Sequence, residues 1–469
     1  MPSVDLAALD EEKLAEWLLN RRWFGSKARD VASIHVLDVV PLIASPTTPP
    51  ALAAALVEAR YPGGTHDVYQ LLLGMGSDDF AEAVVDEVGG VAVYDAFADP
   101  RACDLLGRLL RDGAEIHGEH ARIEFHWREH VEPPRSGASV RPIGAEQSNT
   151  SIVFDDALVL KAFRRVEAGD NPELEMLRFL STRDFPHVAE LGGWYQYEGE
   201  LMDATFGVVQ RFVPNARDGW ELALDELGED PERFVARLRD LGAVIGRMHT
   251  VLASDPADPA FAPEEPSDES LALLTATIDE EIERVFLELP DSEAVAPITG
   301  HAAEVRDRLQ LLSHVGARGK LIRTHGDLHL GQTMLAMGAG GRSPSGWVVL
   351  DFEGEPARPL IERRRKRSPL RDVAGMLRSF AYAASASDMQ RGNPAPEGWE
   401  ERARNAFLTG YLETVDPVLV PPGEGPTRTM LSIFELEKAV YELRYELNNR
   451  PDWVGIPVAG IARLLEEPL

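Results

Sequence analysis

The stretch that decides the fold reads Arg323-Thr-His-Gly-Asp-Leu-His-Leu-Gly-Gln332, and Trp347-Val-Val-Leu-Asp-Phe-Glu-Gly354 follows it. The first segment places a carboxylate, Asp327, in a tight polar loop, with the oxygen-bearing side chain of Gln332 five residues later. The second places another carboxylate, Asp351, at the end of an apolar run typical of a buried strand. The glycine-rich residues 338–346 predict a turn between two short strands. The chain therefore carries two carboxylates and an amide oxygen on neighbouring loops.

This set of groups is suited to phosphoryl transfer, in which one carboxylate orients the attacking hydroxyl and hard oxygen ligands hold Mg2+ on the phosphates. The spacing is similar to the H-x-D-x-x-x-x-N and D-F-G motifs of kinase-like enzymes, with Gln332 in place of Asn and Glu353 where Gly is usual. A zinc site is a weaker alternative: His325 and His329 are four residues apart, but the glutamate of H-E-x-x-H is missing and Gly326 disfavours a helix. We expect instead that one or both histidines orient the loop through backbone hydrogen bonds.

A kinase-like site also requires a loop that covers the phosphates and a lysine on the strand that follows. A hairpin is predicted over residues 151–163, turning at Asp155-Asp156, and Lys161 interrupts its apolar second strand. The polar loop before this hairpin lacks the G-x-G-x-x-G pattern, so the motif is weak by itself. Its candidate nucleotide-binding residues are Gln147, Ser148, Asn149 and Thr150.

The next parts in the expected order are a glutamate that pairs with the lysine and a hinge strand for the purine. A helix should begin with Asn171 as N-cap and Pro172 in its first turn, and Glu175 is the preferred partner of Lys161, with Glu173 as its rival. A strand over residues 206–213 supplies the hinge and carries Gln210 and Phe212. The order of these parts is more informative than any one of them.

Together these motifs resemble the maltokinases, a branch of the aminoglycoside-phosphotransferase and eukaryotic-like kinase superfamily. The resemblance extends to both ends of the chain, through Arg21-Arg-Trp-Phe-Gly-Ser-Lys27 and through Tyr441-Glu-Leu-Arg-Tyr-Glu-Leu-Asn-Asn-Arg-Pro-Asp-Trp453. It implies an ATP-dependent enzyme that phosphorylates maltose at its anomeric hydroxyl and gives maltose 1-phosphate for α-glucan (glycogen) synthesis. It also implies a functional link to trehalose synthase, which supplies maltose.

By matching motif, the resemblance implies that Asp327 is the catalytic carboxylate, that Gln332 and Asp351 are the Mg2+ ligands and that Lys161 binds phosphate. It places the sugar pocket at a further set of aromatic, acidic and polar residues: His325, Tyr441, Glu442, Tyr445, Glu446 and Asn449. Helical spacing lets Tyr441 and Tyr445 share one face, and aromatic faces with carboxylates suit a sugar. Packing between helices is the alternative explanation for these C-terminal residues.

Composition excludes several classes of function. The 469 residues include 47 Lys+Arg against 78 Asp+Glu, so the formal net charge is −31. Such an acidic chain would be repelled by nucleic acid and by anionic membranes. The N-terminus lacks the features of a signal peptide, and no apolar run is long enough to span a membrane, so we expect a cytoplasmic protein. The basic run over residues 363–367 is either a phosphate-binding element or, as we prefer, a loop paired with nearby acids.

These observations predict an α+β, bilobal, protein-kinase-like fold. We expect an N-terminal cap over residues 1–90, an intermediate subdomain with the nucleotide-binding sheet over 91–213, and a helical C-terminal lobe over 214–469. Three alternatives remain: a kinase of another sugar such as glucosamine or glucose, a nucleotide-binding scaffold without catalysis, and a zinc-dependent hydrolase.

Overall fold

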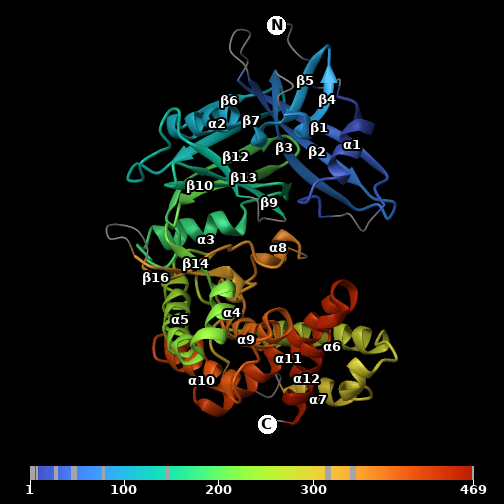
Figure 1. Ribbon diagram of the computed structural model, residues 1–469, viewed down its shortest axis with the longest axis vertical. Helices are drawn as coiled ribbons and strands as arrows, with labels where there is room; N and C mark the ends of the chain where they lie inside the picture. Colours follow the sequence, from blue (N-terminus) through green and yellow to red (C-terminus); the bar gives the residue numbers. More distant parts are fainter. Residues whose placement is uncertain are drawn as a thin grey trace. The chain divides into compact units, whose positions relative to one another are not determined.

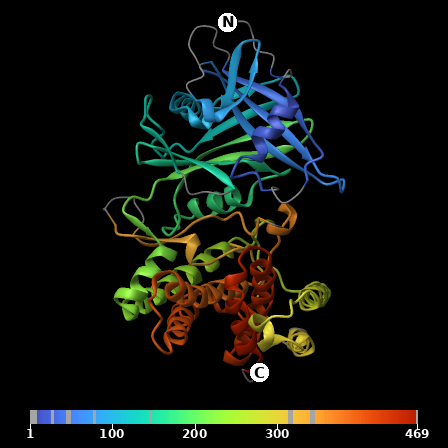
Figure 2. The same cartoon turned by 45° about the vertical axis from the view of Figure 1, so that its right-hand side comes forward.

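The structure is a computed structural model, and it describes residues 6, 9–25, 30–43, 50–76, 80–143, 148–311, 318–338, 345–356 and 358–466. The chain divides into two compact units (Figures 1 and 2). The first comprises residues 1–181 and 189–214, and the second comprises residues 182–188 and 215–469. The main division therefore falls between Pro214 and Asn215, one residue from the predicted lobe boundary.

The first unit begins with an antiparallel sheet that matches the expected cap. Its strand order is β1-β2-β3-β5-β4, and β11 pairs with β3. Helix α1 packs on this sheet, and Trp17, Trp23, Phe24 and Tyr69 form an aromatic core beneath it. The elements are α1 (Glu11–Leu19), β1 (Ser33–Ile43), β2 (Ala51–Arg60), β3 (His66–Gly76), β4 (Val84–Val88), β5 (Val91–Asp95) and β11 (Arg165–Val166).

The cap boundary predicted at residue 90 needs correction, because it separates two paired strands. β4 and β5 form a hairpin with Val88 opposite Val91, so the sheet continues to Asp95. The two sheets of this unit also belong to one compact body rather than to two.

The second sheet of this unit is antiparallel and has the strand order β6-β7-β12-β13-β10-β9-β8. The predicted hairpin is confirmed: β9 and β10 pair, and Asp155 and Asp156 both have φ of 50°, as a tight two-residue turn requires. The predicted helix start is also confirmed, since the Asn171 side chain accepts a 2.8 Å hydrogen bond from the Glu173 amide. The elements are α2 (Pro100–Asp112), β6 (Glu115–His117), β7 (Ala121–Trp127), β8 (Val140–Ile143), β9 (Asn149–Phe154), β10 (Leu158–Phe163), α3 (Pro172–Ser181), β12 (Leu191–Gly199) and β13 (Asp203–Arg211).

The second unit is mostly helical and contains a small sheet of order β14-β15-β16 (Figure 1). Helices α5 and α10 cross so closely that only glycine fits, because a Cβ at Gly410 would lie 1.9 Å from the Arg239 carbonyl oxygen. The elements are β14 (Ala216–Asp218), α4 (Gly219–Glu229), α5 (Pro231–Leu252), α6 (Asp268–Leu287), α7 (Ala302–Gln310), η6 (Leu330–Gln332), β15 (Thr333–Ala336), β16 (Gly346–Val349), α8 (Leu360–Arg363), α9 (Leu370–Arg391), α10 (Trp399–Leu412), α11 (Glu424–Asn449) and α12 (Gly455–Glu466).

The α+β class and the helix-rich second half are confirmed. In the described part of the chain, every helix is too short or too polar to cross a membrane.

Candidate active site

The loop that carries Asp327 is held from beneath by a buried carboxylate at the start of α9. Asp372 accepts hydrogen bonds from the backbone amides of His325 at 2.7 Å and Gly326 at 2.9 Å. Gly326 has φ of 86°, a left-handed conformation that favours glycine, and this turn presents the next residue, Asp327, to the cavity described below. Asp372 therefore fixes the position of Asp327 by holding the two backbone amides that precede it.

Asp372 is itself part of a buried polar chain. His249 on α5 meets its carboxylate through Nε2 at 3.1 Å and meets the Tyr411 hydroxyl through Nδ1 at 3.0 Å. Burial raises the pKa of Asp372, but hydrogen bonds from His249 and the loop amides outweigh it, so the pKa lies below its usual range. The carboxylate therefore stays ionised as the acceptor that the loop amides require.

Both histidines of the motif bond to the backbone, as expected. His325 Nε2 donates to the Leu350 carbonyl at 2.8 Å, and its Nδ1 accepts from the Asp327 amide at 3.4 Å. His329 Nδ1 accepts from the Gly331 amide at 3.1 Å, and burial lowers the pKa of its ring. Within the described ranges, neither histidine belongs to a group of three metal-ligating side chains. The zinc alternative therefore receives no support from the geometry.

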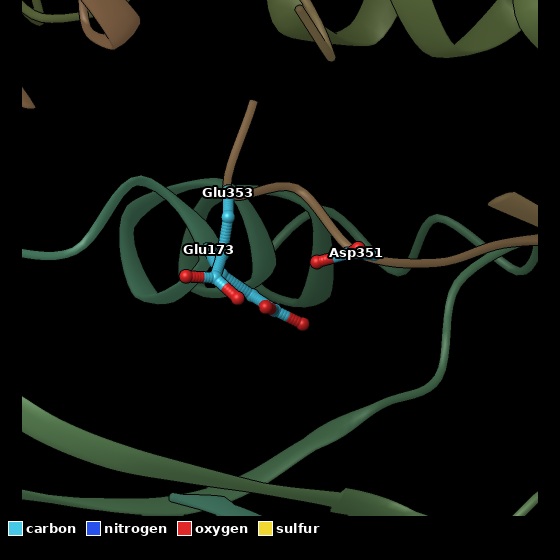
Figure 3. Close-up of side chains that lie close together, drawn as sticks. All are labelled: Glu173, Asp351 and Glu353. Atoms are coloured by element: carbon cyan, nitrogen blue, oxygen red, sulfur yellow. The ribbon is translucent and has the colours of Figure 1, made fainter. Parts of the chain in front are cut away.

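The segment after β16 gathers oxygen ligands. Asp351 adopts a left-handed backbone with φ of 59°, and its carboxylate accepts a 2.9 Å hydrogen bond from the Gln332 amide nitrogen. Figure 3 shows that Asp351 and Glu353 come from this same segment, and their carboxylate oxygens lie within 4.8 Å of each other. Mg2+ prefers carboxylate and amide oxygens over nitrogen or sulfur, so this donor set fits that ion.

The sequence reasoning missed Lys438, on α11. Its ammonium lies 3.2 Å from Asp327 and 3.4 Å from Glu355, and 5.0 Å from the ring centre of Tyr441. Burial lowers the pKa of Lys438, but Asp327 and Glu355 outweigh it and raise the pKa well above its ordinary value. Lys438 is three residues before Tyr441, and this helical spacing is the signal that could have placed both on one face.

Asp327 lines a cavity within the second unit, between the Asp327 loop and helices α9 and α11. The cavity has a volume of about 60 Å3, which is enough for a few water molecules or one small group but not for a disaccharide. We call it the acceptor cavity. Its charged lining residues are Asp327, Glu355, Arg358, Glu362, Arg363, Arg367, Arg371, Asp372, Glu437 and Lys438.

Of the residues expected around the sugar, Tyr441 alone lines this cavity among those the structure describes. His325 is buried, and its ring is used in a hydrogen bond to the Leu350 carbonyl. Glu442 pairs with the buried Arg378 at 2.7 Å, and Glu446 is buried and pairs with Arg450 at 2.6 Å. These three positions differ from the expectation, because each side chain is used to hold secondary-structure elements together.

The last two expected sugar residues lie at the end of α11, outside the lining of the cavity. The side chain of Tyr445 is exposed, and Asn449 donates its amide to the Tyr445 carbonyl at 2.8 Å.

In the first unit, Lys161 forms a 2.6 Å ion pair with Glu173, the rival of the preferred Glu175. Gln210 on β13 donates to the other oxygen of Glu173 at 2.9 Å, so the expected hinge strand is tied to this pair (Figure 3 shows Glu173 on α3). Glu175 is buried on another face of α3, because residues two apart on a helix point in different directions. The expected partner is therefore corrected to Glu173.

The remaining candidate nucleotide residues lie on the flanks of the hairpin. Thr150 accepts a 2.7 Å hydrogen bond from Arg164, and the Phe212 amide donates to the Ala157 carbonyl at 2.8 Å. Asn149 is buried at the start of β9, and Ser148 is exposed just before it. Gln147 lies outside the described residues.

Comparisons with known proteins agree with this architecture. Residues 17–99 match the family described as the maltokinase N-terminal cap domain. The chain is 27% identical to a glucosamine kinase of Mycolicibacterium smegmatis over 342 residues, which cover 70% of this chain and 80% of the relative. It is 26% identical to a glucosamine kinase of Streptacidiphilus jiangxiensis, covering 70% of this chain and 74% of the relative.

A solved structure described as glucosamine kinase in complex with glucosamine, ADP and inorganic phosphate has the same fold. Its TM-score is 0.70 at 18% identity, with 98% of both chains covered. A second crystal form of glucosamine kinase gives a TM-score of 0.73 at 19% identity, covering 98% of this chain and 99% of the other. The bilobal kinase-like fold and the predicted resemblance are thereby confirmed.

Proposed function

We propose that this chain is an ATP-dependent maltose kinase of the superfamily that includes the maltokinases, with an alcohol group of the sugar as the phosphate acceptor. The product is maltose 1-phosphate, which serves α-glucan synthesis, and a trehalose synthase is the proposed source of the maltose. The observation that carries the proposal is Asp327, held by Asp372 and paired with Lys438 at the wall of the acceptor cavity.

In the proposed mechanism, Asp327 orients the anomeric hydroxyl and accepts its proton as the hydroxyl attacks the γ-phosphate. Lys438 holds the Asp327 side chain in place and offers an N–H donor to the sugar. Lys161, aligned by Glu173, binds the phosphates of the nucleotide. When bound by Asp351 and Gln332, with Glu353 nearby, Mg2+ supplies positive charge that neutralises the phosphates.

The charges of the acceptor cavity favour a neutral sugar. In the part of the lining that the structure describes, each carboxylate already has a partner: Asp327 and Glu355 meet Lys438, Glu362 meets Arg358, and Glu437 meets Arg371. The fifth carboxylate, Asp372, accepts hydrogen bonds from the loop amides. A neutral hydroxyl rim can hydrogen-bond to these paired groups, and the ring face of Tyr441 can pack on a sugar ring.

Glucosamine is the second candidate acceptor, and the named relatives favour it. At neutral pH its amino group is largely protonated, and a buried ammonium requires a carboxylate that is not already neutralised. The pairing in the acceptor cavity argues against this substrate.

Asp327→Asn tests the catalytic assignment, because an amide cannot accept the proton. We expect phosphorylation of maltose to fall by about 10²-fold or more, as loss of a general base commonly gives, while ATP binding measured by calorimetry stays within twofold. The matched control is Asp388→Asn, which changes an exposed carboxylate on α9. Turnover by Asp327→Asn equal to that of the control would refute the assignment.

A further inference from the structure

The basic run after the Asp351 segment is only partly explained by pairing with acids. Lys366 meets Glu264 at 2.5 Å, as the preferred interpretation of this run expected. Arg367 is different: it lines the acceptor cavity, and among the described residues its guanidinium has no carboxylate within 4.0 Å. Its one side-chain hydrogen bond is long, from Nη2 to the Glu362 carbonyl at 3.5 Å.

The backbone of Arg367 fixes where this cation lies. Its amide and carbonyl pair with those of Ile322 at 2.8 and 3.0 Å, and Ile322 directly precedes the catalytic stretch. The side chain therefore starts from a point that is tied to the Asp327 loop.

Two further arginines, Arg358 and Arg371, line the same cavity and lie close enough for their charges to act on Arg367. Arg358 pairs with Glu355, and Arg371 pairs with Glu437 and lies over the ring of Phe434. Burial first, and then the charges of Arg371 and Arg358, lower the pKa of Arg367 to about 10. A guanidinium that is desolvated and repelled by neighbouring cations is unfavourable by itself, and an anion beside it would offset both costs.

We propose that Arg367, with Arg358 and Arg371 beside it, forms an oxyanion subsite in the acceptor cavity whose ligand is the phosphate group of a sugar phosphate. The planar guanidinium fork matches phosphate oxygens in a bidentate way, and a cavity of about 60 Å3 admits a group of that size rather than a whole sugar phosphate. The identity of the sugar rests on the proposed function, but the binding of phosphate does not. Because Asp327 lines the same cavity, phosphate bound there excludes the acceptor, and the product inhibits its own formation.

The test is calorimetric titration of the full-length chain without ATP or Mg2+, using inorganic phosphate in one arm and maltose 1-phosphate in the other. Arg367→Gln is compared with the wild type and with Arg365→Gln, which removes an exposed charge from the same basic run. We expect the dissociation constant to rise at least tenfold in Arg367→Gln and to stay within twofold in Arg365→Gln.

The two arms identify the source of the phosphate. If Arg367→Gln binds both ligands more weakly, any phosphate uses the subsite. If it binds only maltose 1-phosphate more weakly, the product is the ligand. Either result supports the subsite. The proposal is overturned if the wild type binds neither ligand, or if Arg367→Gln binds both as the control does. Should Arg367→Gln fail to fold, Arg367→Lys keeps the charge without the fork; we expect at least threefold weaker binding, and unchanged binding would count against the subsite.

Discussion

Replacing Asp372 with asparagine removes the carboxylate that holds the Asp327 loop while leaving Asp327 itself intact. Asp372 accepts three hydrogen bonds, from the amides of His325 and Gly326 and from His249. An asparagine side chain has one acceptor oxygen, and its NH2 group must face one of the two backbone N–H groups. One buried donor is then left without an acceptor.

The magnitude follows from these contacts. Loss of one hydrogen bond to a charged group costs about 1.5–3 kcal/mol, and an unsatisfied buried donor costs about 1–3 kcal/mol. The two costs together come to about 2.5–6 kcal/mol. A value of about 3–4 kcal/mol, in the middle of that range, lowers the population of the active loop conformation by about 10²–10³-fold, since 1.4 kcal/mol is tenfold. We expect kcat for maltose to fall by about 10²-fold, with KM for ATP within threefold.

The assay is steady-state phosphorylation of maltose with a thermal unfolding scan of each variant, and Asp388→Asn on the same helix is the control. Local loosening of the loop predicts a large fall in kcat in protein that is still folded and still binds ATP. A folded Asp372→Asn variant with the kcat of the control would refute the reasoning, because Asp327 would then not depend on Asp372 for its position.

Three further predictions concern other parts of the chain. Lys161→Met should leave Glu173 buried without its cation, and we expect at least a tenfold rise in KM for ATP, measured by steady-state kinetics; an unchanged KM would contradict the phosphate-binding role. Glu435→Gln breaks a buried ion pair with Arg404, whose contacts are 2.7 and 2.8 Å long. Burial raises the pKa of Glu435, but Arg404 outweighs it and keeps the pKa low. Urea unfolding should show that the free energy of unfolding falls by about 3–5 kcal/mol. Because the pKa of Asp372 is lowered on folding, its ionised form stabilises the protein above about pH 4, and this contribution is lost as pH falls through the lowered value. The stability difference between wild type and Asp372→Asn should therefore shrink as the pH is lowered below about pH 4, and a constant difference there would contradict the low pKa.

Local signals in the sequence were sufficient for much of the fold. The turn at Asp155-Asp156 and the cap at Asn171 act within a few residues, so their chemistry is readable from the chain itself. Strand β2 was not predicted, because its run Ala51-Leu-Ala-Ala-Ala-Leu-Val-Glu-Ala-Arg60 has good helix formers. It is a strand because β1 and β3 pair with both its edges, which is information from distant segments.

The same contrast between local signals and information from distant segments applies to the candidate site. Motif spacing predicted that Asp327, Gln332 and Asp351 belong to one site, and the structure brings Gln332 and Asp351 into contact. Spacing could have placed Lys438 on the face of Tyr441, but only the folded chain shows that Lys438 meets Asp327, since a lysine on a helix is ordinarily a solvated charge. The choice of Glu173 over Glu175 likewise depends on how α3 is rotated against β10 and β13, which spacing alone does not fix.

The most direct test of the account is to incubate the chain with ATP, Mg2+ and each of maltose, glucosamine and glucose, and to identify the products by 31P NMR. The account predicts a phosphate on the anomeric oxygen of maltose, formed faster than any phosphate on either monosaccharide and lost in Asp327→Asn. Phosphorylation of glucosamine or glucose without any maltose 1-phosphate would contradict it.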